Sequence, residues 1–154
     1  MIVVEFFEKM FQRRPAPSKI EYPQEETFVE SHFKIKQMYE ELNVEYFQNK
    51  VNASIVWFGD KHKRSTRRKI LGSYDISQNK IKINRILDHS DVPYFFVSFI
   101  IFHEMLHSVY PPKRGKRGRW QIHHREFKQN EKNFSEYARA KAWEKANKHR
   151  FLVI

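Results

Sequence analysis

The stretch FIIFHEMLH, residues 99–107, constrains the fold and chemistry of this chain more than any other. It places two histidines four positions apart, with a glutamate beside the first, at the end of an apolar run that begins at Tyr94. On a helix, side chains four positions apart lie on one face, so His103 and His107 can reach a single ion. Burying these polar groups without a partner would cost several kcal/mol, whereas a bound cation satisfies them. We therefore predict a metal-binding helix.

The glutamate in this stretch has a separate predicted role. Glu104 points about 100° away from His103 around a helix, which suits contact with a water molecule better than a place among the metal ligands. In the His-Glu-x-x-His pattern, zinc lowers the pKa of its water to about 7 and the glutamate takes the proton as that water attacks a carbonyl. The pattern therefore predicts Zn²⁺ as cofactor and Glu104 as general base.

A catalytic zinc ion needs a third protein ligand. The metzincin spacing would require glycine at 110 and histidine at 113, where this chain has Tyr110 and Lys113. We favour His123, because it sits just before a predicted helix, where a loop can fold back over the site. The segment NEKNFS (130–135) is similar to the glutamate-bearing helix of thermolysin-like enzymes. The alternatives that stay open are His124, Glu126, Glu131 and Glu136.

Hydrophobic periodicity predicts two regions in the chain. Residues 1–26 are expected to form an N-terminal helix (2–12) and a linker, and residues 27–154 a single α+β domain. Its predicted elements are a helix over 27–48, strands over 54–58, 69–76 and 79–85, a helix from about 93 to 110, and one or two helices over 124–148. The last two strands are expected to form a hairpin, and Ser90 or Asp91 to cap the metal-binding helix, with Pro93 in its first turn.

Composition limits the class of protein. The chain has no cysteine, which excludes a disulfide framework, a cysteine nucleophile and a thiolate zinc ribbon. The apolar N-terminus lacks a basic region and a small-residue cleavage site, so we do not expect a signal peptide. The longest apolar run is much shorter than the about 20 residues that cross a membrane. We expect a cytoplasmic protein with no membrane partner.

The positive charge is concentrated in two stretches. The formal net charge is +11, and KHKRSTRRK (61–69) and KRGKRGR (113–119) together hold that whole excess. Such clusters bind phosphates, although a solvated surface is the alternative. Because both flank the metal motif, we predict DNA as a partner. The predicted nucleic-acid-binding residues are Lys61, Lys63, Arg64, Arg67, Arg68, Lys113, Arg114, Lys116, Arg117 and Arg119.

Five segments together resemble the SprT-like family, which includes the Spartan proteases. They are LNVEYFQNKV, IVWFGD, LGSYDISQNKIKINRILD, VPYFFVSFIIFHEMLH and HHREF, and they span about residues 28 to 140. The resemblance implies a zincin-like metalloprotease domain in which His103, His107 and His123 hold zinc and Glu104 is catalytic. It also implies DNA-dependent cleavage of proteins bound or crosslinked to DNA.

Two features depart from the family pattern. The third ligand is usually followed by glycine, whereas His124 follows His123 here. Many relatives also carry a cysteine-rich zinc ribbon or long tails that bind DNA. Without cysteine, any contact with DNA has to come from the domain itself.

The strand LGSYDI is predicted to border the substrate cleft. An extended polypeptide could pair with its edge, Gly72 would permit close approach of the backbone, and Tyr74 would bind substrate or an oxyanion unless it simply packs in the sheet. Two other functions compete with a protease: a nucleic-acid-binding module with a structural metal, and a metal-dependent endoribonuclease that uses three histidines. Peptide deformylases share His-Glu-x-x-His but need a cysteine ligand, which this chain lacks.

Overall fold

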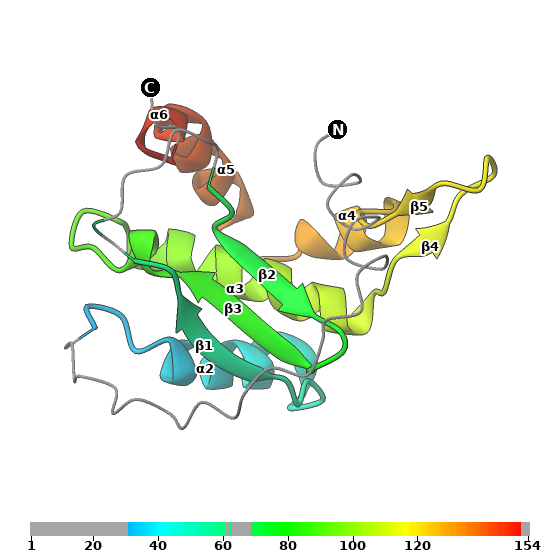
Figure 1. Cartoon of the computed structure of the whole chain (residues 1–154), viewed down its shortest axis with the longest axis horizontal. Helices are drawn as coiled ribbons and strands as arrows, with labels where there is room; N and C mark the ends of the chain where they lie inside the picture. Colours follow the sequence, from blue (N-terminus) through cyan, green and yellow to red (C-terminus); the bar gives the residue numbers. More distant parts are fainter. Residues whose placement is uncertain (1–30, 61, 63–68, 152–154) are drawn as a thin grey trace, which may run out of the picture.

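The computed structural model describes residues 31–60, 62 and 69–151. The predicted N-terminal helix and linker lie outside these residues, as do Lys61, Lys63, Arg64, Arg67 and Arg68. The described chain is α+β, which confirms the predicted class (Figure 1). Its elements in order are α2 (Ile35–Phe47), β1 (Ser54–Phe58), β2 (Gly72–Asp75), β3 (Lys80–Asn84), the 3₁₀ turn η1 (Arg85–Leu87), α3 (Tyr94–Val109), β4 (Lys113–Arg114), β5 (Trp120–Gln121), α4 (Arg125–Glu131), α5 (Tyr137–Ala146) and α6 (Lys148–Phe151).

The main sheet has three strands in the order β1-β3-β2. β3 pairs in parallel with β1 and antiparallel with β2, so the predicted hairpin is confirmed. Its turn is stabilised by Asp75, whose carboxylate accepts hydrogen bonds from the backbone of Ser77 and Gln78. The predicted alternation along β3 is also observed, because Ile81 and Ile83 are fully buried. Strand β2 therefore lies at one edge of this sheet.

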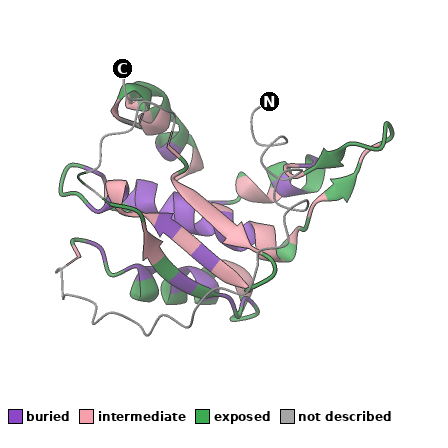
Figure 2. Cartoon of the chain, in the orientation of Figure 1, coloured by how far each residue is buried: buried purple, intermediate pink, exposed green. Residues whose placement is uncertain are grey.

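Helix α3 runs through the centre of the domain and carries the predicted metal motif. Eleven of its 16 residues are buried, and its middle part is mostly purple in Figure 2, while its ends are less buried. It contacts α2, β2, β3, α4 and α5. A helix that is apolar on nearly all sides has to be covered on nearly all sides, and this explains its central place. No helix within the described residues is both long and apolar enough to cross a membrane.

Helix α2 begins later than its periodicity predicted. The apolar spacing suggested a start at residue 27, but residues 31–34 are not helical and α2 begins at Ile35. The backbone N–H of Phe33 donates to Oδ1 of Asp88 over 3.2 Å, and both residues are buried. This long-range hydrogen bond ties the segment to the η1 region. Phe33 therefore reaches the core from an irregular segment.

The predicted cap of α3 was wrong. Neither Ser90 nor Asp91 caps the helix; Pro93 occupies the N-cap position in an extended conformation (ψ 145°), and no side chain caps it. A residue before proline is driven away from helical geometry, so Val92 cannot belong to the first turn. The polar residues that looked like caps therefore lie in the preceding loop.

The C-terminal part contains two helices in the predicted range, which confirms the prediction. Residues 124–148 were predicted to contain one or two helices, and the structure has α4 and α5 there, followed by the short α6 from Lys148. Phe127 of α4 and Phe134 of the α4–α5 connection are both buried. Phe134 packs on Phe99 and Phe102 of α3, with ring centroids 5.7 and 5.3 Å apart. These contacts hold α4 against the metal-motif end of α3.

Candidate metal centre

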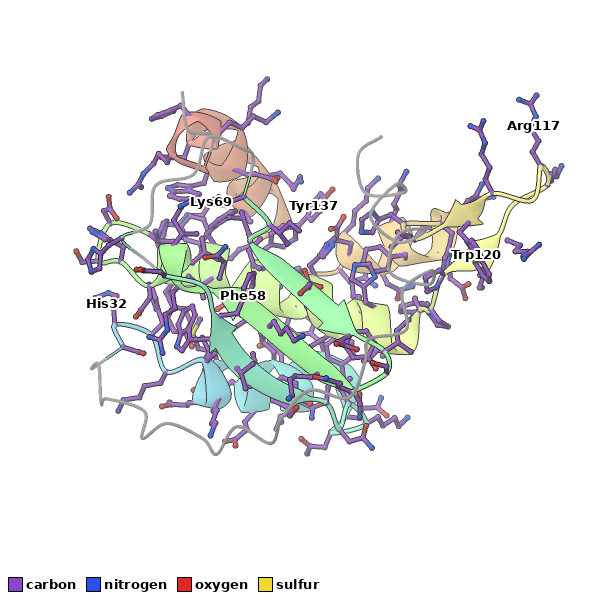
Figure 3. All side chains as sticks on the ribbon, viewed as in Figure 1. His32, Phe58, Lys69, Arg117, Trp120 and Tyr137 are labelled. Atoms are coloured by element: carbon purple, nitrogen blue, oxygen red, sulfur yellow. The ribbon has the colours of Figure 1, made fainter. Side chains whose placement is uncertain are left out.

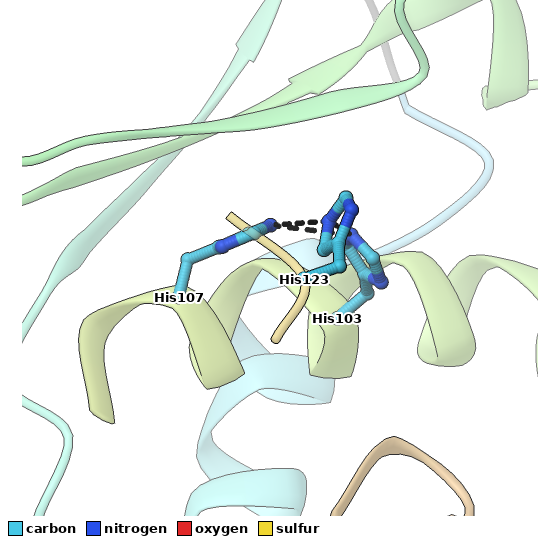
Figure 4. Close-up of side chains that lie close together, drawn as sticks. All are labelled: His103, His107 and His123. Carbon is cyan, nitrogen blue, oxygen red and sulfur yellow. Dashed lines mark hydrogen bonds between the residues drawn. The ribbon is translucent and has the colours of Figure 1, made fainter. Parts of the chain in front are cut away.

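Three histidines converge where α3 meets the segment before α4. His103 and His107 project from successive turns of α3, and His123 comes from the short segment between β5 and α4 (Figure 4). The three Nε2 atoms form a triangle in which each side measures 3.2 Å. Across the described ranges, this is the one group of histidine, aspartate and glutamate side chains close enough to hold a metal ion. The structure thus brings together the pair in the motif and the favoured third residue.

The triangle fits a single cation. A tetrahedral zinc ion with bonds of about 2.0–2.1 Å to histidine has ligand atoms about 3.3 Å apart. The observed 3.2 Å separations are close to that value. Three imidazole nitrogens facing one point cannot satisfy one another with N–H donors alone, whereas one cation accepts all three lone pairs. The three histidines can therefore bind a metal ion without rearrangement.

Glu131 orients the His103 ring. The Nδ1 atom of His103 lies 2.7 Å from Oε1 of Glu131. A carboxylate there accepts a hydrogen bond from Nδ1, which leaves the Nε2 lone pair directed at the triangle. Burial would raise the pKa of Glu131, but the hydrogen bond from His103 outweighs it and holds that pKa below its usual range. Glu131 therefore lies behind His103 and outside the triangle.

The histidine rings rest on an apolar base. The fully buried Phe127 ring lies 5.1, 4.6 and 4.8 Å from the ring centroids of His103, His107 and His123. Burial, followed by the nearby charge of His103, lowers the pKa of His107 to about 2 and of His123 to about 4. Both rings are therefore neutral at pH 7, the form that binds metal.

His103 responds to the same environment differently. Burial lowers its pKa, but the hydrogen bond to Glu131 and the charges of Glu104 and Glu131 outweigh burial, so the pKa is raised. A metal ion bound at Nε2 would replace the proton that the carboxylates attract. The negative surroundings of His103 thus favour a cation at the centre of the triangle.

The other third-ligand alternatives lie elsewhere. His124 is buried at the N-cap of α4, where its Nε2 has no hydrogen-bond partner in the described part of the chain. Glu126 is exposed and pairs with Lys113 over 2.5 Å. Glu136 pairs with Arg139 over 2.7 Å. None of these three side chains belongs to the triangle.

Glu104 lies beside His103 in the sequence and packs against the sheet. Its residue exposure is only 6%, and burial, partly opposed by His103, raises its pKa to about 7. A Cβ atom built on Gly72 would lie 2.8 Å from Oε1 of Glu104 and 2.9 Å from its Cγ. Strand β2 can approach this carboxyl so closely only because residue 72 is a glycine. The sequence suggested close approach by a substrate at Gly72, and the structure places the Glu104 side chain there.

Tyr74 is held within the hairpin. Its hydroxyl donates a 2.9 Å hydrogen bond to Oδ1 of Asn79 in the β2–β3 turn. Its ring is half-buried and packs against the core. Burial, together with the charge of Asp75, raises its pKa. These contacts match the packing alternative for Tyr74.

The second basic stretch is a hairpin rather than a plain loop. β4 and β5 pair antiparallel, Lys113 with Gln121 and Arg114 with Trp120. The hairpin extends from the body of the domain, with Arg117 near its far end (Figure 3). The alternating pattern that marks longer strands is absent from a pair this short, so the sequence carried no clear signal for it.

Comparison of the chain with protein-family models, curated proteins and solved structures finds no match. The resemblance to the SprT-like family stays a prediction.

Proposed function

We propose that this chain is a zinc-dependent endopeptidase that acts on proteins bound or crosslinked to DNA. The observation that carries this proposal is the 3.2 Å triangle of Nε2 atoms with the buried carboxyl of Glu104 beside it on the same helix. Three histidines whose imidazole nitrogens face one point and an adjacent carboxyl with a pKa of about 7 are the parts that metal-assisted hydrolysis requires.

Each group in the centre would have one task. His103, His107 and His123 would hold zinc, which supplies Lewis acidity toward water and toward the substrate carbonyl. Glu104 would accept a proton from the attacking water and deliver it to the leaving amine. A carboxyl with a pKa near the operating pH suits both transfers. Glu131 would keep His103 in the tautomer that presents Nε2.

The free edge of β2 is the proposed binding site for the polypeptide. Among the described strands, β2 pairs only with β3. An extended peptide could add to its open edge through backbone hydrogen bonds. Because Gly72 of β2 lies against Glu104, this edge would bring a substrate backbone close to the proposed base.

A structural metal is the main alternative, and the ligand count argues against it. Structural zinc sites use four protein ligands, whereas catalytic sites use three and keep a position open. The group found within the described residues has three members. Glu131 hydrogen-bonds a ligand, and His124 lies outside the triangle, so neither supplies a fourth.

The first test is Glu104→Gln. Glutamine preserves the shape of the side chain but cannot accept the proton, so we expect bound zinc to stay stoichiometric while cleavage of a DNA-bound protein falls about 10²- to 10⁴-fold. Zinc content by mass spectrometry and cleavage of a protein–DNA crosslink would measure both. Glu136→Gln is the matched control, because Glu136 pairs with Arg139 and does not adjoin the three histidines. Wild-type cleavage by Glu104→Gln would rule out the proposed mechanism.

A further inference from the structure

The β4–β5 hairpin combines three features that the metal centre does not use. It projects from the domain, it carries the second basic stretch, and it exposes a tryptophan (Figure 3). All of its residues from 113 to 121 are exposed except Gly115, which is half-buried. A large aromatic side chain left exposed among cations points to a ligand that is both anionic and planar.

Backbone hydrogen bonds close the turn of the hairpin and leave two charged residues at its tip. The N–H of Gly118 donates to the carbonyl oxygen of Gly115 over 2.9 Å, and the N–H of Gly115 donates to Arg119 O over 2.9 Å. Gly118 has φ +74°, the left-handed conformation that closes short hairpin loops and favours glycine. Lys116 and Arg117 therefore occupy the tip. The backbone of the turn is ordered by its own hydrogen bonds.

Trp120 forms a platform at the base of this turn. Its residue exposure is 52%. The guanidinium carbon of Arg114, its partner across the hairpin, lies 5.1 Å from the ring centroid. This contact orients the indole, while about half of the residue surface stays open to solvent. A flat ligand can stack on that open part, as bases stack on aromatic side chains in single-strand binding proteins.

The lysines and arginines of the hairpin differ in whether they form an ion pair. Lys113 forms an ion pair with Glu126 at the start of α4, which ties the base of the hairpin to the domain. Within the described part of the chain, Lys116, Arg117 and Arg119 form no ion pair with an acidic group. Cations without an acidic partner bind phosphates, and an exposed aromatic ring stacks on bases, so the hairpin carries both kinds of contact that a nucleic-acid strand needs.

We propose that the β4–β5 hairpin is a binding site for single-stranded nucleic acid. A base stacks on Trp120, and Lys116, Arg117 and Arg119 contact the flanking phosphates. Unstacked bases are available in a single strand but not inside a duplex, so the platform selects the single strand. This inference rests on the proposed function, because the hairpin would be the site at which the peptidase binds its nucleic-acid partner.

The hairpin is placed to bring that strand beside the metal centre. Only Ile122 separates the last residue of β5 from His123. Lys113, at the start of the hairpin, is joined to α4, the helix that carries Phe127 under the histidine rings. A protein attached to the bound strand would therefore be held next to the three histidines.

An anionic membrane is the other surface that basic and aromatic residues can bind. Interfacial segments bury a broad apolar face, whereas Trp120 is the one large exposed apolar side chain among residues 113–121. The cation over its ring also suits stacking between planar groups. Single-stranded nucleic acid fits this surface better than lipid.

The test measures binding by Trp120 variants of the full-length Glu104→Gln chain. The probes are a fluorescein-labelled 20-nucleotide oligodeoxythymidine, a duplex of the same length, and vesicles of phosphatidylcholine and phosphatidylserine. We expect Trp120→Ala to weaken single-strand binding about 5- to 100-fold and duplex binding less than about twofold. Trp120→Phe should restore most of the affinity. Tyr94→Ala, at an exposed tyrosine on α3, is the matched control and should change neither.

Three outcomes would overturn the inference. They are equal losses for single strand and duplex, an unchanged affinity in Trp120→Ala, and a preference for phosphatidylserine vesicles over the oligonucleotide. Circular dichroism of each variant would show that its fold is intact. Because Glu104→Gln does not cleave in the proposed mechanism, binding is measured independently of proteolysis. A chain that binds the single strand but has no Glu104-dependent cleavage would refute the proposed function and leave this inference standing.

Discussion

The metal centre and the β4–β5 hairpin adjoin in sequence but differ in almost every physical property. The centre is packed between α3 and α4, with three half-buried histidine rings above the fully buried Phe127. The hairpin is exposed and extends away from the body of the domain (Figure 1). In the centre, each side chain depends on the placement of its neighbours. On the hairpin, the cations act through their charge, and several of them can share one task.

This difference predicts a gradient of sensitivity to substitution. In an enclosed, mutually oriented group, the loss of one member removes the function of the whole. On an exposed charged surface, each cation contributes a small and similar amount to binding. The expected effects of substitution therefore run from the metal centre, where they are largest, to the hairpin, where they are smallest, and each substitution has a control residue that should be dispensable.

The largest effect is expected for His123→Ala. Removing one of three ligands should weaken zinc binding by more than the about 10- to 100-fold that accompanies loss of a group hydrogen-bonded to a ligand. Its neighbour His124 lies outside the triangle, so His124→Ala should keep stoichiometric zinc. Zinc content and competition with a fluorescent chelator would measure the difference, and thermal unfolding would check both folds. If His124→Ala lost zinc and His123→Ala kept it, the assignment of the third ligand would be reversed.

A smaller effect is expected for Glu131, which contacts a ligand without joining the triangle. Glu131→Ala removes the acceptor for Nδ1 of His103, so zinc affinity should fall about 10- to 100-fold. Glu131→Gln keeps a neutral acceptor and should recover part of that loss. If Glu131 only stabilised the fold, Glu131→Ala and Glu131→Gln would have the same unfolding temperature and the same affinity for zinc. Glu126→Ala, which removes an exposed carboxylate from the same helix, should leave zinc affinity within about twofold of wild type.

The histidines of the centre could be predicted from the sequence more readily than the residues that orient them. The pair His103 and His107 followed from helical spacing alone, because four residues return a side chain to the same face. His123 required a fold in the chain between residues 107 and 123, and local spacing only favoured it. The role of Glu131 was missed, because a ligand and a residue that hydrogen-bonds a ligand look alike in a sequence. Only the packing of α4 on α3 distinguishes them.

Gly72 shows the same limit of prediction from sequence. Glycine in a strand indicates that something approaches the backbone closely, but not what approaches. In the structure the neighbour is the Glu104 side chain, a residue 32 positions later in the chain. The predicted start of α2 failed for a similar reason, because the hydrogen bond from Phe33 to Asp88 joins segments 55 positions apart. Local patterns predicted the strands and helices, while contacts distant in sequence decided where some of them begin.

The smallest effect on the fold, and the clearest effect of salt, is expected at the hairpin tip. Lys116→Glu combined with Arg117→Glu should change the free energy of unfolding by no more than about 0.5 kcal/mol, because both side chains are exposed and unpaired among the described residues. The same change removes about two phosphate contacts, so the slope of log affinity against log salt should become shallower by about 1.4 for a single strand. Lys36→Glu with Lys50→Glu changes the net charge equally at exposed sites outside the hairpin. If both pairs flattened the slope to the same degree, binding would depend on net charge alone and the hairpin would have no special role. A loss confined to the tip would mean that the exposed region, like the enclosed one, acts through the positions of particular residues.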